Sequence, residues 1–95
     1  MDHRHEIIWR ISGRVIETIY NPGRKDRPFW QVVIELDNGF ACIYVRREDL
    51  RRVAEKLGEG DLIEASGVTT PHRVVNAAKK PLFLDPVEHL AKLNS

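Results

Sequence analysis

The sequence predicts an all-β domain with one short helix, built from five strands within its 95 residues. Three observations favour this class. A long segment alternates between apolar and polar residues around an internal glycine, an Asn-Gly pair separates two apolar segments, and one short segment has helical spacing. A chain of this length buries a single core, so we expect one domain over residues 1–95, with its folded part covering about residues 6–90.

The first expected strand covers residues 6–20. Its apolar residues fall on one side of an extended chain and its polar residues on the other, with Ile7, Trp9, Ile11 and Val15 facing the core and Arg10, Ser12 and Arg14 facing outward. Gly13 within this strand predicts a bulge or a bend. The turn-forming residues Asn21, Pro22 and Gly23 end the strand, and a polar, basic loop continues to Pro28.

A hairpin is expected next, with strands over residues 29–36 and 40–46. Asn38-Gly39 indicates a two-residue type I′ turn, because both central positions of that turn need positive φ. This turn predicts core-facing pairs of Leu36 with Ala41, Ile34 with Ile43 and Val32 with Val45. The outer face would then pair Asp37 with Phe40, Glu35 with Cys42, Val33 with Tyr44 and Gln31 with Arg46. A longer loop would reassign the faces.

A short amphipathic helix is expected between the third and fourth strands, over residues 46–58. Its apolar residues recur at helical spacing, at Leu50, Val53, Ala54 and Leu57. Glu48 and Asp49 favour its N-terminal end, and Gly58 supplies a residue just past its C-terminal end. The apolar stripe could serve a partner helix, but we favour a helix that closes the bottom of a small barrel, because so short a helix needs tertiary packing.

The remainder of the chain predicts two more strands. Residues 60–70 form the fourth strand, residues 71–81 a second basic connection, and residues 82–90 the fifth strand. Pro86 lacks an amide donor, which places it at a sheet edge or where pairing stops.

Charge is concentrated in two segments, although the net charge of the chain is only +1. Residues 20–30 carry Arg24, Lys25 and Arg27 against Asp26, and residues 70–82 carry Arg73, Lys79 and Lys80 with no acid. Most of the cations in the chain are arginines, which bind phosphate in a fork and stack on planar groups. Such runs are usually solvated loops, so their meaning depends on whether the fold brings the two segments together.

Several functional classes find no support in the sequence. The apolar runs are too short to span a membrane, and the charged N-terminal residues lack the apolar segment of a secretory signal, so we expect a cytoplasmic protein. Cys42 has no partner for an internal disulfide, and no spacing indicates a metal site or a cofactor. No nucleophile with a base or phosphate-cradling loop stands out, so we expect a protein without catalytic activity.

Three segments carry a resemblance to a known fold: Ile11-Ser12-Gly13-Arg14-Val15, the helix end Leu57-Gly58, and Gly60-Asp61-Leu62-Ile63-Glu64-Ala65-Ser66-Gly67-Val68. Together with the order of elements, they resemble the OB-fold, a five-stranded Greek-key barrel with a helix between strands 3 and 4. In length and layout the chain is most similar to small bacterial single-stranded-DNA-binding proteins, the group that includes primosomal replication protein N.

This resemblance implies that single-stranded nucleic acid, with DNA favoured over RNA, crosses the outer face of strands 2 and 3 between the two basic loops. Phe40 and Tyr44 are the expected stacking platforms, and Trp9 and Trp30 fall on core-facing positions. The full set of candidate binding residues is Arg10, Arg14, Arg24, Lys25, Arg27, Phe29, Phe40, Tyr44, Arg46, His72, Arg73, Lys79 and Lys80.

A second interpretation belongs to another class. An OB domain can instead bind proteins, as a subunit of a larger assembly. The near-neutral net charge and the acidic residues Glu35 and Asp37 on the expected outer face support it. A homodimer or a protein partner would suit either interpretation, since an exposed aromatic face can serve both.

Overall fold

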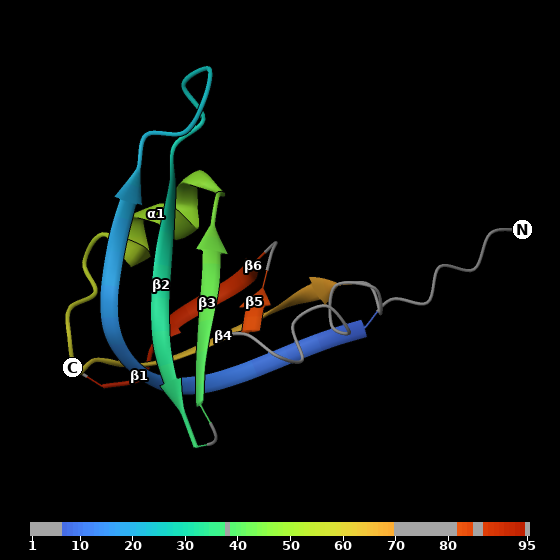
Figure 1. The fold of residues 1–95 in the computed structure, drawn as a ribbon, viewed down its shortest axis with the longest axis vertical. Helices are drawn as coiled ribbons and strands as arrows, with labels where there is room; N and C mark the ends of the chain where they lie inside the picture. Colours follow the sequence, from blue (N-terminus) through green and yellow to red (C-terminus); the bar gives the residue numbers. More distant parts are fainter. Residues whose placement is uncertain (1–6, 38, 70–81, 85–86, 95) are drawn as a thin grey trace, which may run out of the picture.

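The described residues form one six-stranded sheet and one short helix (Figure 1). The computed structural model describes residues 7–37, 39–69, 82–84 and 87–94. In chain order the elements are β1 (Ile7–Asn21), β2 (Phe29–Leu36), β3 (Gly39–Val45), α1 (Glu48–Ala54), β4 (Leu62–Thr69), β5 (Leu82–Leu84) and β6 (Val87–Lys92). The described residues therefore form a mostly β fold with one helix, and this part of the predicted fold class is confirmed.

The strands lie in the order β5-β3-β2-β1-β4-β6. All neighbours are antiparallel except β3 and β5, which are parallel. The prediction of one strand over residues 82–90 is wrong, because this segment contributes two strands that pair with different neighbours, β5 with β3 and β6 with β4. The two outermost strands are thus consecutive in the chain. Pro86, which was expected to mark an edge or the end of pairing, lies outside the described residues.

Strand β1 is long and strongly curved, and it joins two parts of the sheet (Figure 1). Its first half pairs with β4 up to Arg14, and from Arg14 to Asn21 it pairs with β2. The register shifts between Val15 and Glu17, so the bulge lies there and not at the predicted position, Gly13. The glycine serves close packing instead, since an added Cβ atom would lie less than 3.0 Å from the Glu35 carbonyl oxygen.

The predicted register of the β2–β3 hairpin is wrong by two residues. Leu36 pairs with Gly39 rather than with Ala41, and the rest of the ladder shifts with it. Gly39 adopts a φ of 142° within β3, a conformation that residues with a side chain rarely adopt. Gly39 therefore needs its conformational freedom inside β3 and not in the turn. Residues 37–38 separate Leu36 from Gly39, the first pair of the hairpin. Because the shift is even, each side chain keeps its predicted face.

The core lies on the inner face of the curved sheet. The hydrophobic cluster of buried residues comprises Trp9, Val15, Val32, Ile34, Ala41, Ile43, Val45, Leu50, Ala54, Leu57, Ile63, Ala65, Val87 and Leu90. Trp30 is partly buried and packs against this cluster, so the prediction that both tryptophans face the core is confirmed. Of the core-facing pairs predicted for the hairpin, every residue is buried except Leu36, which is partly buried and packs on the cluster.

Helix α1 is shorter than predicted and ends at Ala54, with Glu55 as its C-cap. Gly58 therefore does not follow the helix end directly, which corrects that expectation. Tighter turns continue the chain, because the amide N–H groups of Lys56 and Leu57 donate to carbonyl oxygens three residues earlier, each at 3.1 Å. These turns return Leu57 to the core, so the predicted apolar stripe is preserved. In the described part of the chain, no helix has the length and apolar character to cross a membrane.

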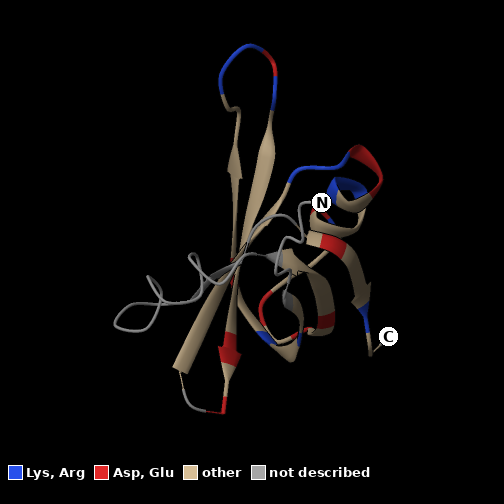
Figure 2. Ribbon diagram, turned by 90° about the vertical axis from the view of Figure 1, so that its right-hand side faces the viewer, with Lys and Arg blue, Asp and Glu red and all other residues tan. Residues whose placement is uncertain are grey.

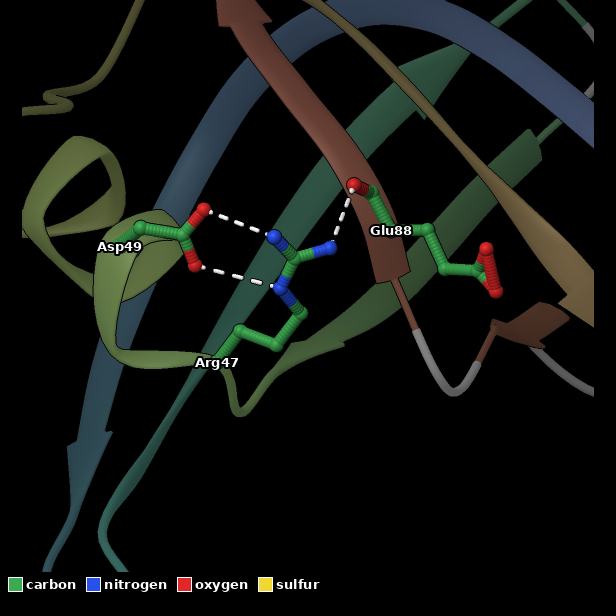
Figure 3. A network of polar contacts seen from close by, with 3 residues as sticks. All are labelled: Arg47, Asp49 and Glu88. Carbon is green, nitrogen blue, oxygen red and sulfur yellow. Dashed lines mark hydrogen bonds and ion pairs between the residues drawn. The ribbon is translucent and has the colours of Figure 1, made fainter.

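Arg47 fastens the start of α1 to β6 (Figure 3). Its Nε and Nη2 atoms donate to the two carboxylate oxygens of Asp49 at 3.2 and 2.9 Å, and its Nη1 atom donates to the Glu88 carbonyl oxygen at 3.3 Å. All three guanidinium nitrogens of Arg47 thus donate hydrogen bonds, and these bonds hold the helix against the sheet.

We expect Arg47→Ala to lower the free energy of unfolding by about 1 kcal/mol, because an exposed ion pair is weak and the bond to β6 adds a similar amount. Thermal denaturation followed by circular dichroism measures the change. Arg52→Ala is the matched control: Arg52 is exposed on the same helix and has no hydrogen bond or ion pair within the described residues. Equal melting temperatures for the two variants would contradict this role for Arg47.

Candidate functional site

An aromatic–arginine cluster, formed by Phe29, Tyr44 and Arg46, lies at one end of the outer face of β2 and β3. The Phe29 and Tyr44 rings are stacked, with centroids 5.7 Å apart and planes 20° from parallel. The Arg46 Cζ atom lies 4.8 Å from the Phe29 centroid and 5.5 Å from the Tyr44 centroid. Both distances are within the range of cation–π contacts. Phe29 and Tyr44 are both partly buried, so the cluster combines partly exposed ring surface with a cation.

The strand register brings this cluster together. Gln31 pairs with Tyr44 and Trp30 with Val45, so Phe29 at the start of β2 lies diagonal to Tyr44 on the same face. The Gln31 Nε2 atom is 3.4 Å from the Tyr44 hydroxyl and donates to it, which holds the end of the Tyr44 side chain on the outer face. We did not single out Gln31 from the sequence, although its place on the outer face was predicted.

The loop between β1 and β2 places cations beside the cluster. The Gly23 amide donates to Asn21 Oδ1 at 2.8 Å, and the Arg27 amide donates to the Arg24 carbonyl oxygen at 3.1 Å. Lys25 and Asp26 occupy the middle of that turn with φ values of 53° and 57°, the left-handed pattern of a type I′ turn. Arg24 and Arg27 are therefore the first and last residues of the turn.

Two adjoining grooves lie at the base of this loop. The first, of about 470 Å³, is lined by Asn21, Gly23, Arg24, Arg27, Phe29 and Arg46. The second, of about 370 Å³, is lined by Asp26, Arg27, Pro28, Arg46 and Arg51. The grooves share Arg27 and Arg46, so they meet beside the cluster. Among the described residues that line it, the first groove has three guanidinium groups and no carboxylate.

Arg51 reaches the second groove from α1. Its Nη1 atom donates to the Pro28 carbonyl oxygen at 3.4 Å, which links the helix to the root of the loop. Its position on the polar side of the predicted helix gave no indication of this role, because the contact joins segments 23 residues apart.

The opposite end of the outer face is acidic. Glu35 pairs with Phe40 and with Arg14, and Asp37 follows at the end of the hairpin. Figure 2 shows the separation: Lys and Arg colour most of the β1–β2 loop, which also carries Asp26, whereas Asp and Glu colour the far end of the hairpin. Phe40 is 49% exposed there, four residues from Tyr44 along β3, or roughly 13 Å at the rise of an extended strand.

The structure thus brings together part of the predicted site. The described residues that converge on the grooves and the cluster are Arg24, Arg27, Phe29, Tyr44 and Arg46. Lys25 lies in the same loop, and Phe40 and Arg14 lie at the acidic end. Arg10 is exposed but pairs with Ser66 of β4, so it does not lie beside β2 or β3. The predicted His72, Arg73, Lys79 and Lys80 lie outside the described residues.

Cys42 lies between these two ends and is 6% exposed. The Gln31 Nε2 atom lies 4.0 Å from its sulfur. Burial raises the pKa of this thiol above its ordinary value of 9.0, and the contact with Gln31 opposes that rise. Because the folded state holds the proton more tightly than the unfolded state, the free energy of unfolding is unaffected below pH 9.0 and falls as the pH rises further.

We expect Cys42 to react with an aromatic disulfide reagent at pH 8 at least about tenfold more slowly in the folded protein than in guanidinium chloride, since a buried thiol yields little thiolate. The absorbance of the released thiolate measures the rate. Equal rates in the two states would show that the outer face is open at this point.

The geometry can hold a flat, negatively charged ligand, because it combines ring faces with guanidinium groups. Within residues 7–37, 39–69, 82–84 and 87–94, no group of three or more His, Cys, Asp or Glu side chains is placed to bind a metal ion. Comparison of the chain with protein-family models, with curated proteins and with solved structures found no match.

Proposed function

We propose that this protein binds single-stranded nucleic acid, with DNA favoured, across the outer face of β2 and β3 and without catalysing a reaction. The observation that carries the proposal is the stacked pair of Phe29 and Tyr44 next to a groove lined by three arginines. A single strand exposes the faces of its bases and one phosphate per nucleotide. Ring stacking contributes about 1–3 kcal/mol per base, and guanidinium groups neutralise the phosphates.

The arrangement of strands supports an OB barrel as the scaffold. We propose that β5 and β6, two separate strands, together take the place of the fifth strand of this barrel. The first pairs in parallel with β3 and the second antiparallel with β4, so together they would join the two ends of the sheet into a Greek-key barrel. In that fold the ligand crosses the face where the aromatic–arginine cluster lies.

The second basic segment completes the proposal. On the OB layout the connection over residues 71–81 would lie opposite the β1–β2 loop, and His72, Arg73, Lys79 and Lys80 would then line the other side of the binding surface. These residues lie outside the described part of the chain, so their contribution is a prediction. We expect the protein to act in the cytoplasm.

A titration of fluorescein-labelled oligo-dT, oligo-U and a duplex, read by fluorescence anisotropy at two salt concentrations, tests the proposal. We expect the single strands to bind more tightly than the duplex, and their affinity to fall several-fold as salt rises from 50 to 200 mM, because counterions are released on binding. At a fixed salt concentration, Arg73→Ala should bind the single strands more weakly than the original protein does. Affinity that does not depend on salt, or no binding at micromolar protein, would contradict the proposal.

A second function, as a protein-binding subunit of a larger assembly, is favoured by the acidic end of the same face. There Phe40 is 49% exposed and pairs with Glu35, an arrangement that suits a basic, apolar protein surface better than a phosphate backbone. Co-purification of a protein partner, lost in Phe40→Ala and with no change in oligonucleotide mobility, would support this function over the first.

A further inference from the structure

We propose that the groove lined by Arg24, Arg27 and Arg46 takes the terminal phosphate of a strand, so that the protein binds strand ends in preference to internal segments. This inference rests on the proposed function and specifies its ligand as a strand with a terminal phosphate. Lys and Arg predominate at one end of the β2–β3 hairpin, where the β1–β2 loop lies, and Asp and Glu at the other end (Figure 2).

Cations gather at the end of the face where the cluster lies. The first groove has three arginines among its lining residues, and Arg51 adds a fourth guanidinium group in the adjoining groove. Among the described lining residues of the two grooves, Asp26 is the one carboxylate. The described residues at this end therefore form a compact basic site.

The rest of the described outer face is not a phosphate track. Three acidic residues follow along this face: Glu17, which pairs with Val33, then Glu35 and Asp37 of the hairpin. Arg14, which pairs with Glu35, is the cation next to them. A strand that continued along this face would bring its next phosphates against carboxylates, which opposes binding. The described surface therefore suits a nucleic-acid strand that ends at the grooves better than one that continues past them along the outer face.

The charge of the first groove also matches a terminal phosphate. An internal phosphodiester carries one negative charge, whereas a terminal phosphomonoester carries between 1.5 and 2 at pH 7, since its second pKa is about 6. The three arginines, with no carboxylate among the described lining residues, would stabilise the more highly charged group, because each additional charge interacts with all three cations. Phe29 belongs to the same groove and to the stacked pair, so the terminal base would lie on the rings next to its own phosphate.

The experiment compares dT oligomers of one length that differ only at their ends, carrying a 5′-phosphate, a 3′-phosphate or hydroxyl groups at both ends, each with the same internal fluorophore. A circular dT strand, which has no end, is the fourth ligand. We expect one of the two phosphorylated strands to bind about tenfold more tightly than the hydroxyl strand at fixed salt, and the circle to bind no better than the hydroxyl strand. The identity of the tighter strand gives the polarity of binding.

Variants locate the effect. Arg24→Ala and Arg27→Ala should remove most of the tenfold preference, whereas Arg52→Ala, an exposed arginine of α1 outside the grooves, should preserve it. Melting temperatures confirm that each variant folds. Equal affinities for phosphorylated, hydroxyl and circular strands would overturn this inference and leave the proposed function standing. No binding of any strand would overturn both.

Discussion

Gly13→Ala is expected to lower the melting temperature by roughly 15 °C, corresponding to a loss of about 3 kcal/mol. An added Cβ atom would lie less than 3.0 Å from the Glu35 carbonyl oxygen and 2.5 Å from Ile34 Cγ2. The first of these is backbone and the second belongs to a fully buried side chain, so neither can move without separating β1 from β2. Thermal denaturation followed by circular dichroism measures the shift.

Gly58→Ala is the matched control for this substitution. No atom lies within 4 Å of the position of its Cβ atom, and its φ is not positive. Its melting temperature should stay the same or rise by a few degrees, since alanine restricts the unfolded chain. A Gly13→Ala protein that melts within a few degrees of the original would show that β1 and β2 do not approach as closely as the structure indicates.

The double substitution of Phe29 and Tyr44 by alanine is expected to weaken oligo-dT binding by about 100-fold, and each single substitution by about tenfold. On the proposed function each ring would offer one base a stacking surface, and the loss of such a surface costs about 1–3 kcal/mol. Arg46 would also lose both rings over which it lies, so the phosphate contacts beside the cluster should weaken as well. Fluorescence anisotropy with labelled oligo-dT measures these affinities.

Tyr20→Ala provides the aromatic control. Tyr20 is 54% exposed and packs edge-on against Trp30, with ring centroids 5.2 Å apart, so it belongs to the core-facing side of the sheet. Its removal should leave the affinity within about twofold. If Tyr20→Ala and Tyr44→Ala weakened binding equally, the effect would arise from general loss of aromatic surface and not from the cluster.

The cluster itself illustrates how far the sequence can predict a site. Alternation assigns Phe29, Tyr44 and Arg46 to the outer side of their strands, because side-chain direction depends only on the parity of the position. Their contact depends on register. In the predicted register Tyr44 lies opposite Val33, whereas the observed pairing with Gln31 moves it one row closer to Phe29. The difference stems from Gly39. The Asn38-Gly39 dipeptide predicts a turn, but Gly39 pairs with Leu36 as part of β3.

The strand order shows a similar limit. Periodicity predicts where extended segments occur, and β1, β2, β3 and β4 lie within two residues of their expected bounds. It contains no information about which neighbours a segment chooses, so the division of the last strand between β3 and β4 was missed. The position of the bulge after Val15 was missed for a related reason, because the close approach of β1 to Glu35 depends on residues distant in sequence.

Nuclear magnetic resonance tests the central claim most directly, by following the amide signals of the isotope-labelled protein during titration with oligo-dT. We expect the largest shifts at Phe29, Gln31, Tyr44, Arg46 and the β1–β2 loop, and small shifts in α1 beyond Arg51. Shifts confined to α1 and β6, or spectra that do not change at saturating oligonucleotide, would contradict binding at the outer face of β2 and β3.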